Sequence, residues 1–383
     1  MEPRPVHGGN LAWAAEIAGC SPSGLVDFSA SINPLGPPES VQRALQAALA
    51  TLGHYPDPAY TDLRSALGLH HHLPADWVLP GNGAAELITW AARDLASLDP
   101  PTLYLPTPAF NDYQRACRSF GVTIAPWPLW PPTPGPDAPA ALSPPVPTLP
   151  IPTPPIPTID LRVRDLVATA PPKAGVLINN PHNPTGHLFG LEDLRPLLDH
   201  FRLVVVDEAF MDFLPPTAAP SLAPWVEHYP NLVVLRSLTK FYSLPGLRLG
   251  YALGHPDRLH RWQRWRDPWP VNTLAAAAAL AAVADQIFQA QTWAWLPPTR
   301  QALRDNLAAL GGFSPLPSAA NYLLVRAAGS VTDLQHTLLR QSQVLIRDCL
   351  SFAELGDHYF RVAVRSEAEN DYLLTALTAA QGV

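Results

Sequence analysis

The stretch "NLVVLRSLTKFYSLPGLRLGYALG", residues 231–254, places a lysine shortly after an apolar run. Leu232–Leu235 is continuous and apolar, which predicts a strand buried on both faces. The chain then turns through hydroxyls and glycines, and Lys240 stands in that turn with no acidic residue nearby in the sequence. A lysine in such a turn is commonly a solvated loop residue. The alternative is that its amine takes part in chemistry, and the rest of the chain decides between the two.

Similar apolar runs alternate with helical patterns through the middle of the chain. The strand-like runs are residues 101–107, 174–181, 202–210 and 232–237, and the helical patterns are 109–120, 191–201 and 272–290. Alternation of this kind predicts an α/β fold, with a mostly parallel mixed sheet flanked by helices. Ligands bind at the carboxyl ends of strands in such sheets.

The two ends of the chain have a different pattern, which predicts a second, smaller α+β domain. We expect residues 1–50 to contribute to this small domain and to the site, 51–285 to form the large domain, and 286–383 to complete the small one. Residues 126–158 are expected to be a surface insertion, because Pro126 to Pro157 contains 15 prolines in 32 residues. Such a stretch disfavours helix and sheet ladders. A docking site for a proline-recognition domain is the alternative interpretation.

Composition excludes several classes of protein. The chain has 383 residues, of which 47% are hydrophobic and 15% charged, as is typical of a soluble globular protein. Its net charge of −7 argues against a nucleic-acid surface. Cys20, Cys117 and Cys349 are too widely spaced for a disulfide framework or a metal site. The opening residues show no secretory signal and the apolar run 274–284 is too short to span a bilayer. We therefore expect a cytoplasmic protein that binds neither membranes nor metals.

The predicted strand ends carry residues suited to one cofactor. Gly81–Asn82–Gly83 precedes a helical pattern, and the free N–H groups of a helix N-terminus suit a phosphate. Asp207 follows four apolar residues, so its carboxylate requires a partner. Ser237, Thr239 and Arg248 add donors around Lys240. This set would suit pyridoxal phosphate, with the lysine as its Schiff-base partner and the aspartate paired with the pyridinium nitrogen.

The order GNG, NNPHNPTG, DEAF, SLTKF and GLRLGY resembles the fold-type I pyridoxal-phosphate enzymes of the aspartate aminotransferase class. The branch resembled is that of the histidinol-phosphate aminotransferases and threonine-phosphate decarboxylases. The resemblance covers nearly the whole chain except the proline-rich insertion. It implies a homodimer with shared active sites, a large domain that binds pyridoxal 5'-phosphate, and a small phosphorylated amino acid as substrate.

The resemblance also implies roles for individual residues. Lys240 and Asp207 would be catalytic. The implied cofactor contacts are Gly83, Ala84, Ala85, Ser237 and Arg248 on the phosphate, Asn183 on the ring hydroxyl, Phe110 on the ring face, and Tyr55 across the dimer interface. The implied substrate contacts are His7, Gly8, Ser31, Asn183, Arg347 and Arg361. Two converging arginines suit a phosphate or carboxylate, each charge-assisted bond contributing roughly 1.5 to 3 kcal/mol. Arg365 shares a strand face with Arg361 but is equally suited to a surface ion pair.

The N-terminus favours one reaction within this branch. "HGGN" (7–10) and "DFSASINPLGPP" (27–38) resemble the opening of the threonine-phosphate decarboxylases, although Ser31 stands where that family has asparagine. Phe210 stands where the aminotransferases usually carry tyrosine. If the arginines and His7 hold the substrate's phosphate, its carboxylate can lie perpendicular to the ring and leave as carbon dioxide. We therefore expect decarboxylation of O-phospho-L-threonine to (R)-1-amino-2-propanol O-phosphate for cobalamin biosynthesis, with a histidinol-phosphate-type aminotransferase as the alternative.

Other interpretations have less support in the sequence. Residues 258–272 interleave arginines with tryptophans, a pattern also found on nucleic-acid surfaces, but the negative net charge opposes that function. His70–His72 lacks a carboxylate or cysteine at metal-ligand spacing and is expected to form a solvated turn. A non-catalytic regulator with this fold would carry an added DNA-binding domain, and no helix-turn-helix pattern precedes residue 27.

Overall fold

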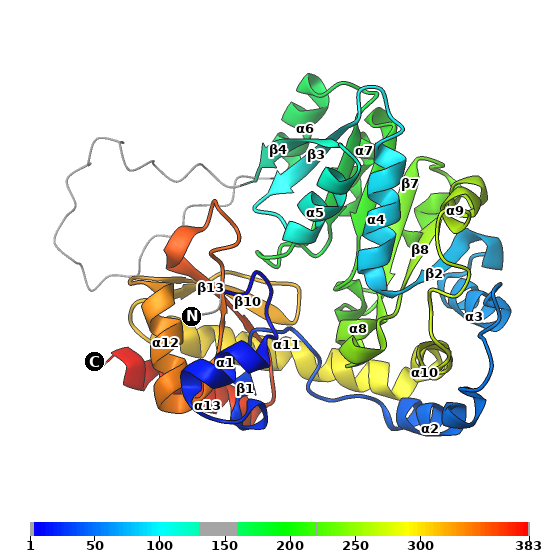
Figure 1. Cartoon of the computed structure of the whole chain (residues 1–383). Coiled ribbons are helices and arrows are strands. Elements are labelled where there is room, and N and C mark those ends of the chain that lie inside the picture. The colour runs from blue at the N-terminus through cyan, green and yellow to red at the C-terminus, as the bar shows by residue number, and fades with distance from the viewer. Residues whose placement is uncertain (1–3, 130–158, 219–220, 382–383) are drawn as a thin grey trace.

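The computed structural model describes residues 4–129, 159–218 and 221–381, and its centre is a seven-stranded sheet (Figure 1). The strands lie in the order β2-β8-β7-β6-β5-β3-β4. Their bounds are β2 Val78–Gly81, β3 Thr102–Thr107, β4 Thr123–Pro128, β5 Gly175–Asn179, β6 Leu203–Asp207, β7 Leu232–Ser237 and β8 Gly250–Gly254. The pairs from β7 to β4 are parallel, and β8 runs antiparallel to both neighbours. The predicted mostly parallel mixed sheet is confirmed.

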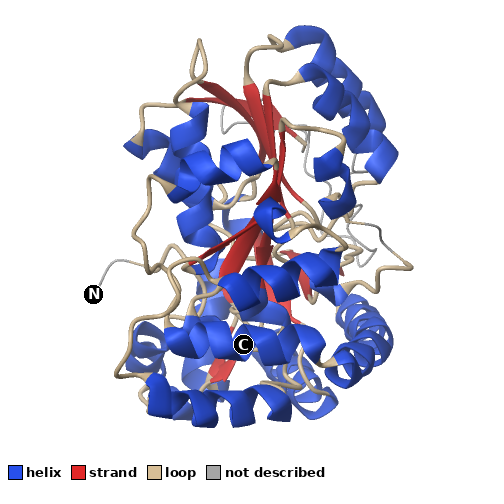
Figure 2. Ribbon diagram, turned by 90° about the vertical axis from the view of Figure 1, so that its right-hand side faces the viewer, coloured by secondary structure: helices blue, strands red, loops and turns tan. Residues whose placement is uncertain are grey.

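Helices cover both faces of this sheet (Figure 2). One face packs against α4 Gly83–Leu95, α5 Asn111–Ser119 and α9 Pro256–Gln263, and the other against α6 Ile159–Thr169 and α7 Leu191–His200. Buried alanines of α10 Thr273–Ala284 belong to the same apolar core as α6 and α7. Successive residues of β6 alternate between the two apolar cores, with Leu203 and Val205 in one and Val204 and Val206 in the other. Because both faces are buried, the strands read as continuous apolar runs in the sequence.

The edge strand β4 includes the first three residues of the expected insertion. Pro126 pairs with Leu105 and Pro128 with Thr107 of β3. The N–H of Thr123 donates to Pro101 at 2.8 Å and that of Leu129 to Thr107 at 3.0 Å, so the odd-numbered N–H groups of β4 face β3. The even-numbered positions, where the prolines stand, turn their backbone nitrogens away from β3, toward a side on which no other described strand pairs. Residues 130–158 of the expected insertion lie outside the described residues.

A smaller unit contains a four-stranded sheet with the order β12-β13-β10-β9, all antiparallel. Its strands are β9 Phe313–Pro315, β10 Tyr322–Ala327, β12 Arg347–Asp348 and β13 Tyr359–Ala363, and its helices are α12 Val331–Ser342 and α13 Glu367–Gln381. The N-terminal segment joins this unit, because β1 Val26–Asp27 pairs with β11 Val344–Leu345 and α1 Leu11–Ala18 packs on α12. We propose the domain limits 1–50, 51–285 and 286–383 on this basis.

Two local predictions differ from the structure. The pattern 272–290 predicted one helix, but the chain ends α10 and begins α11 Gln286–Ala309 at Asp285, whose side chain accepts the Phe288 N–H at 2.9 Å. His70–His72 was expected to form a solvated turn, whereas α3 Thr61–His71 includes the first two of these histidines. The imidazole Nε2 of His71 lies 2.8 Å from the Tyr251 hydroxyl, which anchors the helix end to β8.

The remaining helices are α2 Glu39–Ala48, which packs on α10, and α8 Leu238–Phe241, which directly follows β7. Among the described residues, no single helix is long and apolar enough to cross a membrane. The adjoining helices α10 and α11 meet those criteria of length and composition only when taken together, and they are bent by 69° where they meet.

Candidate active site

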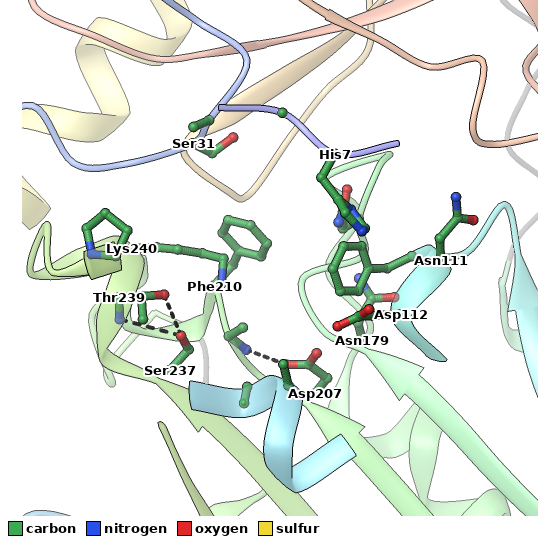
Figure 3. Close-up of a pocket in the computed structure, with 18 of the residues that line it drawn as sticks. His7, Ser31, Asn111, Asp112, Asn179, Asp207, Phe210, Ser237, Thr239 and Lys240 are labelled. Carbon is green, nitrogen blue, oxygen red and sulfur yellow. Dashed lines mark hydrogen bonds between the residues drawn. The ribbon is translucent and has the colours of Figure 1, made fainter. Parts of the chain in front are cut away.

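A cavity of about 370 Å³ opens at the carboxyl ends of β5, β6 and β7, between the large sheet and the smaller unit (Figure 3). The structure gathers most of the predicted site residues around it. Those that line it are His7, Gly8, Ser31, Ala84, Ala85, Phe110, Asn183, Asp207, Ser237, Lys240, Arg248, Arg347 and Arg361. The residues predicted from the rule that ligands bind at strand ends therefore line one common cavity.

Lys240 enters the cavity from α8, the short helix that follows β7. Its Nζ lies 5.1 Å from the centre of the Phe210 ring. Burial lowers the pKa of this amine below its ordinary value; Asp207 opposes that shift, and Arg248 and Arg361 add to it. The unprotonated, nucleophilic amine is therefore available at a lower pH than for a lysine in water. The structure thus favours the chemical role of Lys240 over that of a solvated loop lysine.

Asp207, the last residue of β6, is 6% exposed. Its Oδ2 accepts the Tyr113 hydroxyl at 2.8 Å and its Oδ1 accepts the Ala209 N–H at 3.0 Å. Burial raises the pKa of the carboxyl, and this effect outweighs the opposing effects of Lys240, Tyr113 and Ala209. A protonated pyridine nitrogen bound in the cavity would supply a further positive charge. That charge would keep the Asp207 carboxylate ionised.

Backbone and hydroxyl donors gather at one end of the cavity. Ala84 and Ala85 belong to the first turn of α4, where N–H groups have no acceptor within the helix. The hydroxyl oxygens of Ser237 and Thr239 lie 2.8 Å apart, and the guanidinium of Arg248 lines the same wall. These groups form the donor set that a cofactor phosphate requires.

The predicted contact of the Gly83 N–H with the cofactor phosphate stays a prediction. Gly83 lies outside the cavity lining, with φ +75°, and a Cβ there would stand 2.6 Å from an Arg248 nitrogen. Its small size lets the Arg248 guanidinium pass close to the helix start. Gly83 therefore leaves room for Arg248 beside the other phosphate donors, and this donor set (Ala84, Ala85, Ser237, Thr239 and Arg248) is called the phosphate cradle below.

The cofactor's ring positions have further candidate partners. Phe110 lines the cavity at the start of α5, and the His7 ring lies 5.5 Å from it. Asn183 is 8% exposed and its Oδ1 accepts a hydrogen bond from Arg361. Asn179 stands opposite Asp207 in the parallel pairing of β5 and β6, and it also lines the cavity.

The two predicted substrate arginines are direct cross-strand partners. Arg347 of β12 pairs with Arg361 of β13, and both side chains line the cavity. Like charges directly opposite each other are destabilising in a sheet, so an anion in the cavity would relieve their repulsion. Arg365, by contrast, binds Glu369 and the Asp27 carbonyl, which favours the structural interpretation of that residue.

Tyr55 lies outside this cavity within its own chain. Its side chain is 79% exposed and stacks on Trp269, with ring centroids 4.5 Å apart. Its predicted contact requires a second subunit and remains a proposal.

The structure also adds Tyr113 and Asn179 to the site, which the sequence reasoning missed. Tyr113 follows Phe110 by three residues at the start of α5, so helical spacing could have indicated a common face.

The buried, doubly hydrogen-bonded carboxylate, the amine with lowered pKa and the phosphate cradle fit one cofactor, pyridoxal phosphate. On this fold they define a pyridoxal-phosphate-dependent enzyme of fold type I. The family model "Aminotransferase class I and II" matches residues 23–377, and the chain belongs to this family.

Three relatives illustrate the similarity. A threonine-phosphate decarboxylase of Salmonella typhimurium is 38% identical over 97% of this chain and 95% of its own length. Histidinol-phosphate aminotransferase 2 of Thiobacillus denitrificans is 30% identical over 96% of this chain and 97% of its own. Among solved structures, a histidinol-phosphate aminotransferase from Clostridium acetobutylicum has a TM-score of 0.80 at 24% identity, covering 94% of this chain and all of its own.

Proposed function

We propose that the protein decarboxylates O-phospho-L-threonine to (R)-1-amino-2-propanol O-phosphate, a step in cobalamin biosynthesis. The observation that carries the phosphorylated substrate is the pair of Arg347 and Arg361, which line the cavity from strands of the smaller unit, whereas the phosphate cradle lies at α4 of the large domain. A second anionic group, distinct from the cofactor's own phosphate, is therefore expected on the substrate. The similarity to a threonine-phosphate decarboxylase supports the choice of that substrate.

The cavity's own residues account for the main requirements of this reaction. When bound, pyridoxal phosphate supplies an electron-accepting ring conjugated to the substrate's Cα. Arg347, Arg361 and His7 would bind the substrate's phosphate and so turn its carboxylate out of the ring plane. The Cα–carboxylate bond would then break with release of carbon dioxide, and Nζ of Lys240 would donate a proton to Cα. Asp207 would hold the proton on the ring nitrogen throughout.

Transamination of histidinol phosphate is the second candidate. The same two arginines suit the phosphate of that substrate, and the 30% identity to a histidinol-phosphate aminotransferase favours it. The two functions differ in which bond at Cα is perpendicular to the ring. They also differ in whether a keto acid is required.

The first test therefore omits any keto acid. Purified protein would be supplied with pyridoxal phosphate and O-phospho-L-threonine, and released carbon dioxide and amino-propanol phosphate would be measured. We expect many turnovers per enzyme molecule. Amino transfer from histidinol phosphate to 2-oxoglutarate, without carbon dioxide release from phosphothreonine, would overturn the proposal in favour of the second candidate.

We also propose a cytoplasmic homodimer with shared active sites. The homodimer is supported by the exposed Tyr55–Trp269 pair and by the exposure of Arg248, a residue of the phosphate cradle, in a single chain. In the dimer, Tyr55 would extend its hydroxyl to the cofactor phosphate of the partner subunit.

Replacing Arg361 with alanine should weaken substrate binding while the cofactor stays bound. Arg361 faces the substrate end of the cavity, and losing two charge-assisted hydrogen bonds predicts a KM increase of roughly 100-fold. The visible cofactor band should be unchanged. Arg361→Lys should give an intermediate KM, and Arg365→Ala, which lies outside the cavity, should leave KM near that of the wild type. Loss of the cofactor from Arg361→Ala would show that this arginine is misplaced.

A further inference from the structure

Residues 4–9, here called the N-terminal strap, run along the mouth of the cavity. Val6, His7 and Gly8 line it. The strap is fixed at its C-terminal end, where the Gly9 N–H donates to Ser29 Oγ at 2.7 Å. A Cβ at Gly8 would lie 2.3 Å from the Ser29 carbonyl oxygen, so the backbone packs directly on this segment. The position of His7 therefore also depends on what holds the other end.

Arg4 holds that other end. Its Nε donates to Asp348 Oδ2 at 3.1 Å, its Nη1 lies 3.4 Å from the Thr332 hydroxyl, and its Nη2 donates to the Gln335 amide oxygen. Asp348 is 3% exposed and Gln335 is 2% exposed. The Arg4 guanidinium therefore binds to buried polar side chains between β12 and α12. The Gln335 amide is itself fixed by donating to the Ile346 carbonyl at 2.8 Å.

The residue next to Asp348 is the substrate arginine Arg347, and it contacts the same strap. Its guanidinium donates to the carbonyls of Pro5 and Val6, and to the Ser351 hydroxyl at 2.6 Å. Two consecutive residues of β12 thus bind the strap, one through the Arg4 side chain and one through the strap backbone. The strap carbonyls in turn orient the Arg347 guanidinium at the cavity wall.

We propose that Arg4 is a positioning residue for substrate binding. Its attachment to Asp348, Gln335 and Thr332 keeps the strap carbonyls on Arg347 and keeps His7 at the cavity mouth. Without Arg4 the strap would be held only from Gly9 onward and by Arg347 itself. The Arg347 guanidinium would then no longer be held in one orientation. The site would bind an anionic substrate more weakly as a result. The kinetic part of this inference rests on the proposed function; the attachment of the strap does not.

The attachment is tested by hydrogen–deuterium exchange on the cofactor-loaded enzyme. Arg4→Met preserves the length of the side chain but removes its charge and donors. We expect amides of the peptide covering residues 6–13 to exchange roughly 10-fold faster than in the wild type, since bonds to a charged partner are lost. Arg4→Lys should give an intermediate exchange rate. An ammonium keeps the ion pair with Asp348 but lacks the planar guanidinium that donates to several partners at once. Arg195→Met, in an exposed pair with Glu192 on α7, is the matched control and should not change this peptide.

The positioning role is tested by kinetics of the same variants. Arg4→Met should raise KM for O-phospho-L-threonine roughly 10-fold, leave kcat within about 2-fold, and be partly rescued by Arg4→Lys. Unchanged exchange, or faster exchange with unchanged KM, would overturn the proposal. If wild-type enzyme releases no carbon dioxide, the proposed function fails instead. The positioning role of Arg4 is then tested by amide hydrogen–deuterium exchange and by the affinity for inorganic phosphate. Arg4→Met should lower this affinity and Arg195→Met should not.

Discussion

Replacing Lys240 with alanine is expected to abolish turnover and to remove the visible absorption band of the bound cofactor. The Lys240 amine reaches the cavity with a pKa lowered by burial, as a nucleophile that attaches an aldehyde cofactor requires. The same amine is the proposed proton donor to Cα. Losing both roles predicts a fall in kcat of roughly 10³-fold or more. Absorbance spectra and carbon dioxide release would be measured on the same preparation.

The sequence supplies a matched control for this experiment. It contains two lysines, Lys173 and Lys240, and Lys173 is exposed outside the cavity. Lys173→Ala should retain both the absorption band and turnover. Reduction with borohydride, followed by peptide mass spectrometry, should attach the cofactor to the peptide with Lys240 and leave Lys173 unmodified. Cofactor attached at Lys173, or full turnover by Lys240→Ala, would contradict the assignment.

The second large effect is expected for Asp207→Asn, which should reduce kcat by roughly 10²- to 10⁴-fold. Asparagine has nearly the same shape but no charge, so a protonated ring nitrogen would lose its buried partner at a cost of about 3 to 5 kcal/mol. The amide also conflicts with its surroundings. The Tyr113 hydroxyl and the Ala209 N–H both donate to the carboxylate, and an NH₂ group would meet one of these donors.

Tyr113→Phe separates charge from hydrogen bonding in this experiment. It removes one hydrogen bond to Asp207 and leaves the carboxylate in place, so it should reduce kcat by only about 10-fold. Cofactor absorbance titrated against pH would report the ring's protonation in each variant. An Asp207→Asn enzyme with kcat like that of Tyr113→Phe would contradict a charged partnership between Asp207 and the ring.

The sequence predicted best the parts of the site that depend on local pattern. Asp207 ends β6 and Lys240 lies three residues beyond the end of β7, so their placement required only the period and length of the apolar runs before them. The cross-strand pairing of Arg347 with Arg361 depends on the register between distant segments, which no local pattern specifies. The side-chain bond from Tyr113 to Asp207 spans 94 positions and was missed for the same reason.

Other differences arose where tertiary contacts changed a local preference. The pattern 272–290 remains helical on both sides of Asp285, yet the cap formed by that side chain starts a new helix. The motif around Gly83 gave no sign that a Cβ at this position would meet the Arg248 guanidinium, which the turn before β8 brings close. Arg4 stands in a proline-broken opening and gave no sequence signal at all, because its partners are more than 300 positions away.

The prolines of β4 bear on how the protein behaves at high concentration. An edge strand with a full row of outward N–H groups can recruit the edge of another molecule and start aggregation. In β4 two such donors are absent, because Pro126 and Pro128 occupy outward-facing positions. Replacing both prolines with valine would restore those donors and add β-branched side chains at the edge. Within the part of the chain that the structure describes, the β4 edge thus lacks two of the outward donors that intermolecular strand pairing uses.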